Sequence, residues 1–134
     1  NRVFVLLSDG EIDEGSNWEA FLFAPHHELN NLSVIVDYNK LQSIKPVAET
    51  LNLEPLSEKL QSFGWEVTTV DGHNHQEIEY ALKNNSNKPI FLIADTIKGK
   101  GVSFMENSVL WHYRSPQGQE YLDALEELSE GVIS

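Results

Sequence analysis

The sequence contains no cysteine and few basic residues, and these shortages exclude several classes of protein. Without cysteine, neither disulfides nor thiolate metal sites can form. The nine lysines and arginines stand against 21 aspartates and glutamates, which gives a formal net charge of −12. This balance argues against nucleic acid as a partner, because its phosphates are bound mainly by Lys and Arg. Bulk charge could not attract an anionic cofactor either, so such a ligand would need a bridging cation and local backbone N–H groups.

Long hydrophobic runs are also missing. No run approaches the roughly 18 apolar residues of a membrane helix, and no signal-peptide pattern is visible. We therefore expect a cytoplasmic protein without a membrane partner. With 134 residues, 40% of them hydrophobic, the chain has the size and composition of one globular domain with a modest core.

Four apolar or β-rich runs predict strands, and helical patterns separate them. The predicted strands span residues 3–7, 32–36, 65–70 and 89–94. The first run shows no alternation of apolar and polar residues, which predicts a strand buried on both faces. The third alternates in part and is expected nearer a sheet edge. This order predicts an α/β fold, a three-layer α/β/α sandwich with a mostly parallel sheet.

The first helix is expected to begin at Ser16. Ser16 and Glu19 form the Ser-x-x-Glu pattern of a capping box. Pro25 falls late in the same segment, where it removes a backbone donor and should kink or restart the helix. The side chains expected on its buried face are Trp18, Phe21, Leu22 and Phe23.

Three more helices follow farther along the chain. Residues 55–64 combine Pro55 in the first turn, apolar residues at helical spacing and a final glycine. Residues 75–84 and 121–128 show similar apolar spacing. Residues 37–54, in contrast, form a long irregular stretch, and loops of that length in a compact domain are usually functional or mobile.

Two polar residues stand where the first two strands end. Asp9 follows the strand at 3–7, and Asn39 follows the strand at 32–36. The carboxyl ends of parallel strands meet at one edge of the sheet, where α/β proteins bind ligands. Two oxygen-bearing side chains therefore converge on one point. A hard divalent cation with a phosphate ligand suits that point, because Mg²⁺ completes its octahedron with phosphate and water.

Asp9-Gly10, followed thirty positions later by Asn39, is similar to the thiamine-diphosphate motif, which runs from Gly-Asp-Gly to Asn. The flanking residues 11–20 resemble the transketolase version of this motif, with its Glu-Gly-x-x-Trp-Glu-Ala continuation. Downstream, residues 98–107 and the pair Trp111-His112 also resemble transketolase. The resemblance extends from Val3 to Pro116, which is nearly the whole chain.

The resemblance implies a specific set of ligands. The Asp9 carboxylate, the Asn39 amide oxygen and the backbone carbonyl of Leu41 would hold Mg²⁺ or Ca²⁺, with diphosphate oxygens and a water completing the shell. The N–H of Gly10 would point at the diphosphate of thiamine diphosphate. The family usually has Gly where this chain has Ser8. Because Ser is small, we expect reduced backbone freedom there and a retained site.

Three further residues have assignments that come from the resemblance. By sequence alone Glu14 is a solvated acid, Lys98 a surface charge and His112 a structural histidine. In the family, the matching Glu joins a carboxylate network at the dimer interface that reaches the neighbouring subunit's cofactor. The matching His reaches the diphosphate and the reacting carbon, and the Lys lies beside the cofactor. We therefore assign His112 and Glu14 as catalytic and Lys98 as cofactor-binding. Structural or surface roles are expected for His26, His27, His73 and His75, and packing roles for Trp18, Trp65 and Trp111.

The implied reaction is transfer of a two-carbon ketol unit from a ketose phosphate to an aldose phosphate through Mg²⁺-thiamine diphosphate. In the family, this needs a pyrimidine-binding domain, supplied by the same polypeptide or by a C-terminal subunit. We therefore expect a homodimer or a heterotetramer, and a chain that is inactive alone.

Residues 1–134 are accordingly interpreted as a transketolase-type diphosphate-binding domain that is incomplete at its N-terminus, with 117–134 as a C-terminal helix and tail. Either a piece of a longer protein or one subunit of a split transketolase would give this pattern, and the acidic last helix favours the split subunit. Alternatives are a non-catalytic thiamine-diphosphate-, metal- or partner-binding module, a deoxyxylulose-phosphate synthase, or a 2-oxoacid dehydrogenase subunit. The Trp18-Glu19-Ala20 and Trp111-His112 patterns count against the two enzymes.

Overall fold

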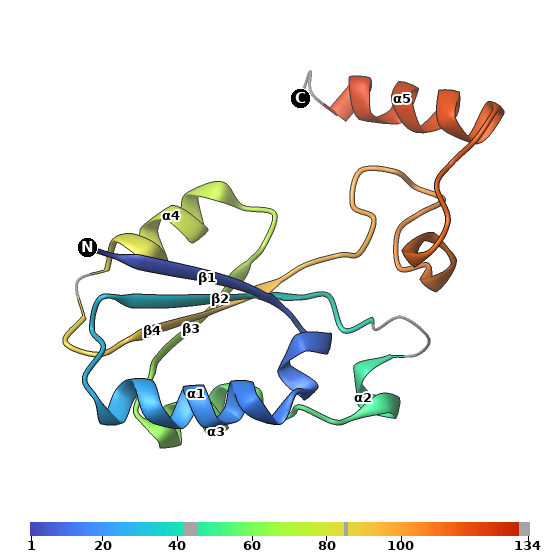
Figure 1. The fold of residues 1–134 in the computed structure, drawn as a ribbon. Helices are drawn as coiled ribbons and strands as arrows, with labels where there is room; N and C mark the ends of the chain where they lie inside the picture. The colour runs from blue at the N-terminus through green and yellow to red at the C-terminus, as the bar shows by residue number, and fades with distance from the viewer. Residues whose placement is uncertain (42–45, 85, 132–134) are drawn as a thin grey trace.

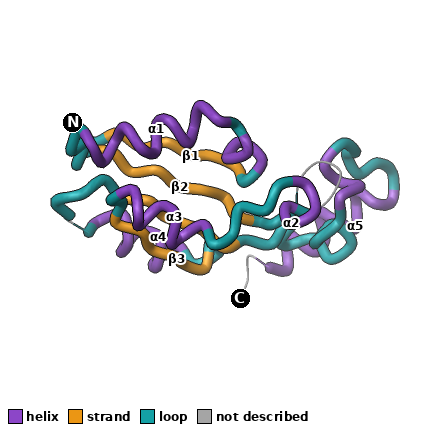
Figure 2. The backbone as a smooth tube through the Cα atoms, turned by 90° about the horizontal axis from the view of Figure 1, so that it is seen from below, coloured by secondary structure: helices purple, strands orange, loops and turns teal. Residues whose placement is uncertain are grey.

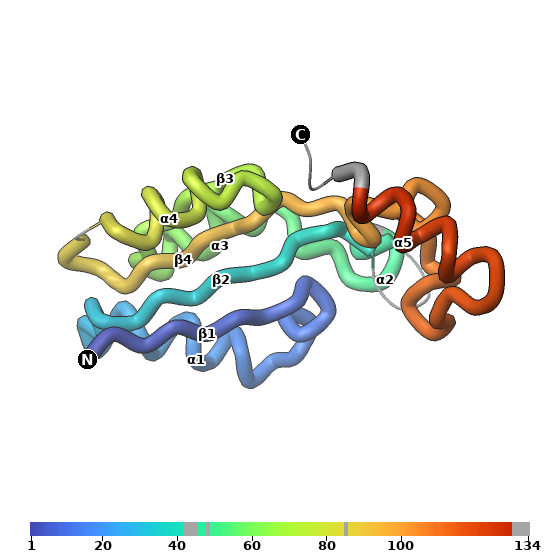
Figure 3. The backbone as a smooth tube through the Cα atoms, turned by 90° about the horizontal axis from the view of Figure 1, so that it is seen from above, coloured from blue at the N-terminus to red at the C-terminus, as the bar shows by residue number. Residues whose placement is uncertain are grey.

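A computed structural model of the chain describes residues 1–41, 46–84 and 86–131. Its centre is a four-stranded sheet in the order β1-β2-β4-β3 (Figure 3). All three strand pairings are parallel, which confirms the predicted sheet type. The strands are β1 Val3–Ser8, β2 Leu32–Tyr38, β3 Glu66–Asp71 and β4 Ile90–Asp95.

Helices cover both faces of this sheet. The helices α1 (Gly15–His26) and α3 (Leu56–Phe63) lie on one face, and α4 (His75–Lys83) lies on the other (Figures 1 and 2). This arrangement confirms the predicted three layers. Among the described residues, no helix is both long and apolar enough to cross a membrane. The remaining elements are η1 Gly10–Asp13, α2 Val47–Thr50, η2 Val109–His112 and α5 Gln119–Gly131.

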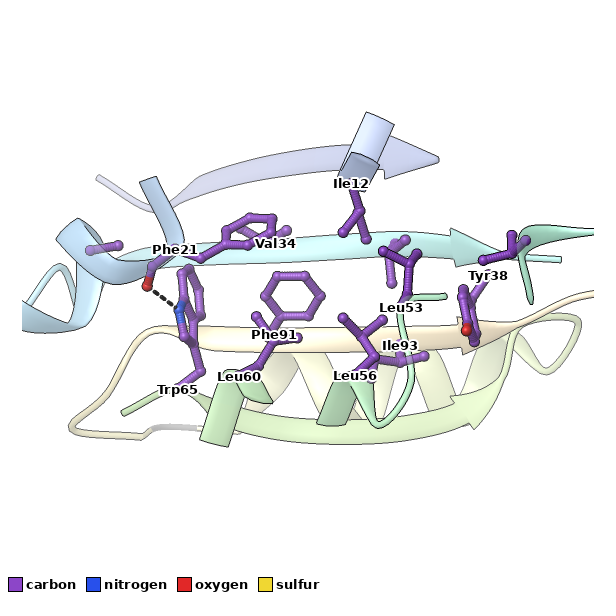
Figure 4. Close-up of a cluster of buried hydrophobic side chains, with 13 residues drawn as sticks. Ile12, Phe21, Val34, Tyr38, Leu53, Leu56, Leu60, Trp65, Phe91 and Ile93 are labelled. Carbon is purple, nitrogen blue, oxygen red and sulfur yellow. Dashed lines mark hydrogen bonds between the residues drawn. The ribbon is translucent and has the colours of Figure 1, made fainter. Parts of the chain in front are cut away.

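The main core lies between the sheet and the pair α1 and α3. Phe21, Trp65 and Phe91 meet edge to face there, with ring centroids 5.1 to 6.1 Å apart (Figure 4). The indole N–H of Trp65 donates to the Phe21 carbonyl at 2.7 Å. In a regular helix that carbonyl would accept from residue 25, which is proline and has no N–H. Trp65 therefore supplies the donor that Pro25 lacks, and α1 runs on to His26.

The prediction that the first strand is buried on both faces is wrong. β1 is an edge strand. Val5 and Leu7 pack on the core, but the alternate residues Phe4 and Leu6 are 52% and 70% exposed. The uniform apolar run signals two faces that can be buried, and α4 packs on β3 and β4 instead of on β1.

Two expectations about the first helix are also wrong. α1 begins at Gly15 with Glu14 at the N-cap position, so Ser16 lies inside the first turn and is not a capping residue. Leu22 and Phe23 are more than half exposed, although Phe21 is buried as predicted. The helix has more apolar side chains than its contact with α3 and the sheet can bury.

The other predicted elements are found close to their expected places. Gly64 ends α3 in the left-handed conformation, with φ of 108°, while Pro55 takes the N-cap position and not the first turn. β3 is at the sheet edge, as predicted. The long stretch 37–54 includes the short helix α2, and its residues 42–45 lie outside the described residues. α5 forms as predicted.

Candidate functional site

The segments that leave β1, β2 and β4 emerge at the same end of the sheet (Figure 1). A cleft of about 540 Å³ lies between them. It is lined by Ser8, Asp9, Gly10, Glu11, Glu14, Asp37, Asn39, Leu41, Lys98 and His112. All seven site residues predicted from the sequence are in this set, so the fold brings together positions that are up to 103 residues apart, from Asp9 to His112.

Asp9 is the buried acid of the cleft. It follows β1 directly and is 3% exposed. Its Oδ2 accepts a hydrogen bond of 2.8 Å from the backbone N–H of Lys40, at the end of β2. Burial raises the pKa of the Asp9 carboxyl; the N–H groups of Lys40 and Gly10 lower it in part, while Asp37 and Asp13 add to the rise. A carboxylate that is desolvated in this way is stabilised by a cation.

Asn39 and Leu41 form a tight turn beside Asp9. The Asn39 Oδ1 accepts from the Leu41 N–H at 3.0 Å, and Lys40 between them has a left-handed backbone with φ of 64°. An amide oxygen has two lone pairs, so Oδ1 retains acceptor capacity beyond this bond. Leu41 also pairs with Pro46 in an isolated bridge, which holds the turn against the following segment.

These donors fit a hard cation that carries phosphate. Carboxylate, amide and carbonyl oxygens are the ligand types that Mg²⁺ and Ca²⁺ take. Among the residues that the structure describes, no three His, Cys, Asp or Glu side chains are grouped to hold a metal by themselves. A cation at Asp9 would therefore depend on Asn39, Leu41 and ligand oxygens. Within the described chain, no atom beyond its neighbours lies within 4 Å of the point where a Gly10 Cβ would stand, so the approach is open.

Ser8 fits this turn without backbone strain. The described non-glycine residues with positive φ are Glu28, Lys40 and Asn107, so Ser8 is outside the left-handed region. Its N–H and hydroxyl both donate to Glu11 Oε2, at 2.8 and 3.0 Å. The serine thus holds the Glu11 carboxylate at the rim of the cleft.

Lys98 and His112 meet across the loop that follows β4. Lys98 Nζ lies 3.2 Å from His112 Nδ1. Because an ammonium only donates, Nδ1 is the acceptor, and a neutral imidazole then carries its proton on Nε2. The loop needs glycine at position 99, where φ is 76° and a Cβ would lie 2.5 Å from the Met105 carbonyl oxygen. Asn107 closes the loop by donating its N–H to the Lys98 carbonyl at 2.9 Å.

Glu11 and Asp37 line the cleft but were not among the predicted site residues. Asp37 precedes Asn39 by two positions, and side chains two apart in a strand share a face, which was a usable signal. Glu11 was hidden in an acidic loop with no feature to distinguish it. With Asp9 and Glu14, these residues make the cleft lining acidic, and Lys98 is its one lysine or arginine among the described residues.

The residues predicted to be structural lie outside the cleft lining. Trp18 and Trp111 donate their indole N–H groups to the Ile12 and Phe104 carbonyls, as packing residues do. Among the histidines, His73 accepts a backbone hydrogen bond from Ile97. The described lining contains none of the four histidines assigned structural or surface roles, which are His26, His27, His73 and His75.

Comparison with known proteins gives a consistent result. The family model described as "Transketolase, thiamine diphosphate binding domain" matches residues 1–127. One of the two subunits named for an apulose-4-phosphate transketolase, from Actinobacillus succinogenes, is 41% identical over 131 residues, which cover 96% of this chain and 48% of that protein. A 6-deoxy-6-sulfo-D-fructose transketolase subunit of a Clostridium species is 39% identical over 133 residues, covering 97% of this chain and 48% of that protein.

Solved structures agree with the sequence relatives. Transketolase from Campylobacter jejuni superposes with a TM-score of 0.86 and 31% identity, covering 96% of this chain and 21% of that protein. The chain spans about half the length of the curated relatives that it matches most extensively in sequence.

Proposed function

The chain belongs to the transketolase family, and on this premise we propose that it is the diphosphate-binding part of an enzyme that transfers a two-carbon ketol unit between sugar phosphates. One observation carries the proposal. Asp9, Asn39, Lys98 and His112 come from three separate loops and line a single cleft at the carboxyl end of the sheet. Ligands of parallel α/β folds bind at that end.

In this proposal, the metal is Mg²⁺ or Ca²⁺, held by the Asp9 carboxylate, the Asn39 amide oxygen and the Leu41 carbonyl. Its charge offsets the acidic lining and allows a diphosphate to enter. The Gly10 N–H, at the turn after β1, is available to a diphosphate oxygen. Thiamine diphosphate supplies, when bound, the carbanion chemistry that breaks and remakes the carbon–carbon bond.

His112 and Lys98 are the proposed groups on the opposite wall. Lys98 donates to Nδ1, which leaves the proton of the neutral imidazole on Nε2. A histidine held in one tautomer can exchange a proton with a sugar hydroxyl and can donate to a phosphate oxygen. Lys98 adds a positive charge near the diphosphate. Glu14, exposed at the start of α1, is positioned to reach a second protomer, where it would join a carboxylate network.

We propose a separate pyrimidine-binding domain or polypeptide as the partner, in a homodimer or heterotetramer located in the cytoplasm. The names of two relatives support this, because each is called a transketolase subunit. Both names also contain a sugar derivative, which supports sugar phosphates or similar acidic sugars as the substrate class.

Reconstitution tests this proposal. The chain is mixed with a candidate pyrimidine-domain polypeptide, thiamine diphosphate, Mg²⁺, a ketose phosphate and an aldose phosphate, and the new ketose is detected by mass spectrometry. We expect product only when both polypeptides are present. His112→Asn is the matched variant, and it should associate with the partner and yield little product. Failure of an associated, cofactor-loaded complex to transfer a ketol unit would reject the enzymatic assignment.

A further inference from the structure

The turn Asp71-Gly72-His73 lies beside the chain that leaves β4. The N–H of Gly72 donates to the Asp95 carbonyl at 2.8 Å, and a Cβ on Gly72 would stand 2.3 Å from Thr96 Cγ2. The turn therefore packs flat against residues 95–97. Only glycine allows this approach.

His73 adds a side-chain bond to the same segment. Its Nε2 accepts a hydrogen bond of 2.8 Å from the backbone N–H of Ile97. The His73 backbone N–H in turn donates to Asp71 Oδ1 at 2.9 Å, which fixes the histidine within the turn. Acceptance through Nε2 requires that this nitrogen carry no proton.

The other side of the segment is tied to the end of β2. The Thr96 N–H donates to the Tyr38 carbonyl at 3.4 Å, and the Thr96 hydroxyl donates to the Asp37 carboxylate. Residues 96 and 97 are thus bonded from both neighbouring strand ends. The next residue is Lys98, whose Nζ contacts His112.

We propose that His73 is a positioning residue of the cleft: its Nε2 holds the Ile97 N–H and so sets the position of Lys98 and, through it, of His112. This inference rests on the proposed function for its catalytic meaning, but its structural part stands on geometry alone. His73 itself lies outside the cleft lining and touches a second hollow of about 560 Å³.

The bond should respond to acid. Protonation of Nε2 turns the acceptor into a donor and removes the Ile97 bond. The charged groups that line the hollow around His73 are Asp71 on β3, Glu77 on α4, Asp95 on β4 and Lys100 in the following loop. Acidification within the titration range of His73 is therefore expected to release Ile97 before the sheet itself unfolds.

Two amide variants separate positioning from simple packing. In His73→Gln, Oε1 is as many bonds from Cβ as the imidazole Nε2, so it can accept from Ile97. In His73→Asn, the same chemical group is one carbon too short. We expect hydrogen exchange of the Ile97 amide to accelerate about fivefold in His73→Asn, the factor of one ordinary hydrogen bond. His73→Gln should keep the exchange rate of the unmodified chain.

Further readouts follow the effect to the cleft. The ring resonances of His112 should shift in His73→Asn and remain in place in His73→Gln. The Ile97 amide resonance should follow the titration of His73 in the unmodified chain and lose that dependence in His73→Gln. Equal behaviour of the two variants, or unchanged Ile97 exchange in His73→Asn, overturns the proposal. These measurements need no cofactor, so absence of thiamine diphosphate binding would reject the proposed function while leaving this result to be decided independently.

Discussion

The carboxylate of Asp9 accepts a hydrogen bond from the backbone N–H of Lys40, at 2.8 Å and across 31 residues of sequence. This bond ties the end of β1 to the end of β2. It places the buried acid beside the Asn39 turn before any ligand is present. The geometry for a cation is therefore built by the fold, and the uncompensated charge of Asp9 is the cost of having it ready.

Asp9→Asn should leave the ligand-free chain as stable as the unmodified chain, or more stable, at neutral pH. The pKa of Asp9 is raised by burial, so the folded state binds this proton more tightly than the unfolded state does. By linkage, stability then falls as pH rises through the window between the unfolded pKa and the raised folded pKa. Asn keeps an oxygen for the Lys40 N–H and carries no charge.

Urea unfolding at a series of pH values checks this sign. The unmodified chain should gain stability relative to Asp9→Asn as pH falls through that window. A loss of more than about 1 kcal/mol in Asp9→Asn at neutral pH, the size of an ordinary hydrogen bond, would mean that the ionised carboxylate stabilises the fold.

Trp65→Phe should lower the free energy of unfolding by about 1–3 kcal/mol, the cost of leaving a buried carbonyl without a partner. The carbonyl is that of Phe21, which Trp65 reaches at 2.7 Å and which Pro25 cannot serve. Trp111→Phe is the control, because Trp111 also donates to a carbonyl but is less buried. Equal losses in the two variants would contradict this account.

A double-mutant cycle tests the compensation directly. Pro25→Ala restores a backbone N–H four residues after Phe21. In that background, Trp65→Phe should cost less than it does alone, because the helix now supplies the donor. Chemical unfolding of the four proteins gives the coupling energy, and strict additivity would show that Trp65 does not replace the missing donor.

The sequence predicts the elements and the site well, because both depend on local patterns. Apolar runs mark the strands, and parallel strands must end together, so Asp9 and Asn39 converge without further information. Burial is less predictable. The exposure of Phe4, Leu6 and Leu22 depends on which faces have neighbours, and an apolar pattern records only that a face can be covered.

Long-range polar bonds were also beyond the sequence. The bond from Trp65 to Phe21 crosses 44 residues and that from Ile97 to His73 crosses 24. No periodicity signals either pair, since each depends on how two turns or helices meet in space. Pro25 was a visible irregularity, but the residue that compensates for it was not.

Ser8→Gly should change thiamine diphosphate affinity by no more than about twofold, the range of substitutions that remove no buried contact. The backbone at Ser8 is already compatible with a side chain. The change releases the Glu11 carboxylate from the serine hydroxyl. Affinity measured for both proteins in the presence of the partner and Mg²⁺ checks this, and a gain of an order of magnitude would show that the serine restricts the site.

His112→Asn should reduce ketol transfer in the reconstituted complex by about 100-fold or more, the range for a lost general acid–base group. Stability should change little, because His112 is exposed. Rates with saturating cofactor, compared with thermal unfolding of the same preparations, separate the two effects. A variant that keeps full turnover would remove His112 from the proposed catalytic groups.

The central claim is that this cleft binds thiamine diphosphate through a cation on Asp9. Calorimetric titration of thiamine diphosphate into the chain, with and without Mg²⁺ and with and without a pyrimidine-domain partner, tests it most directly. We predict heat of binding that requires the metal and disappears in Asp9→Asn, a variant expected to remain folded. Binding that is unchanged without Mg²⁺ or in Asp9→Asn, or no binding by a folded chain associated with its partner, would contradict the account.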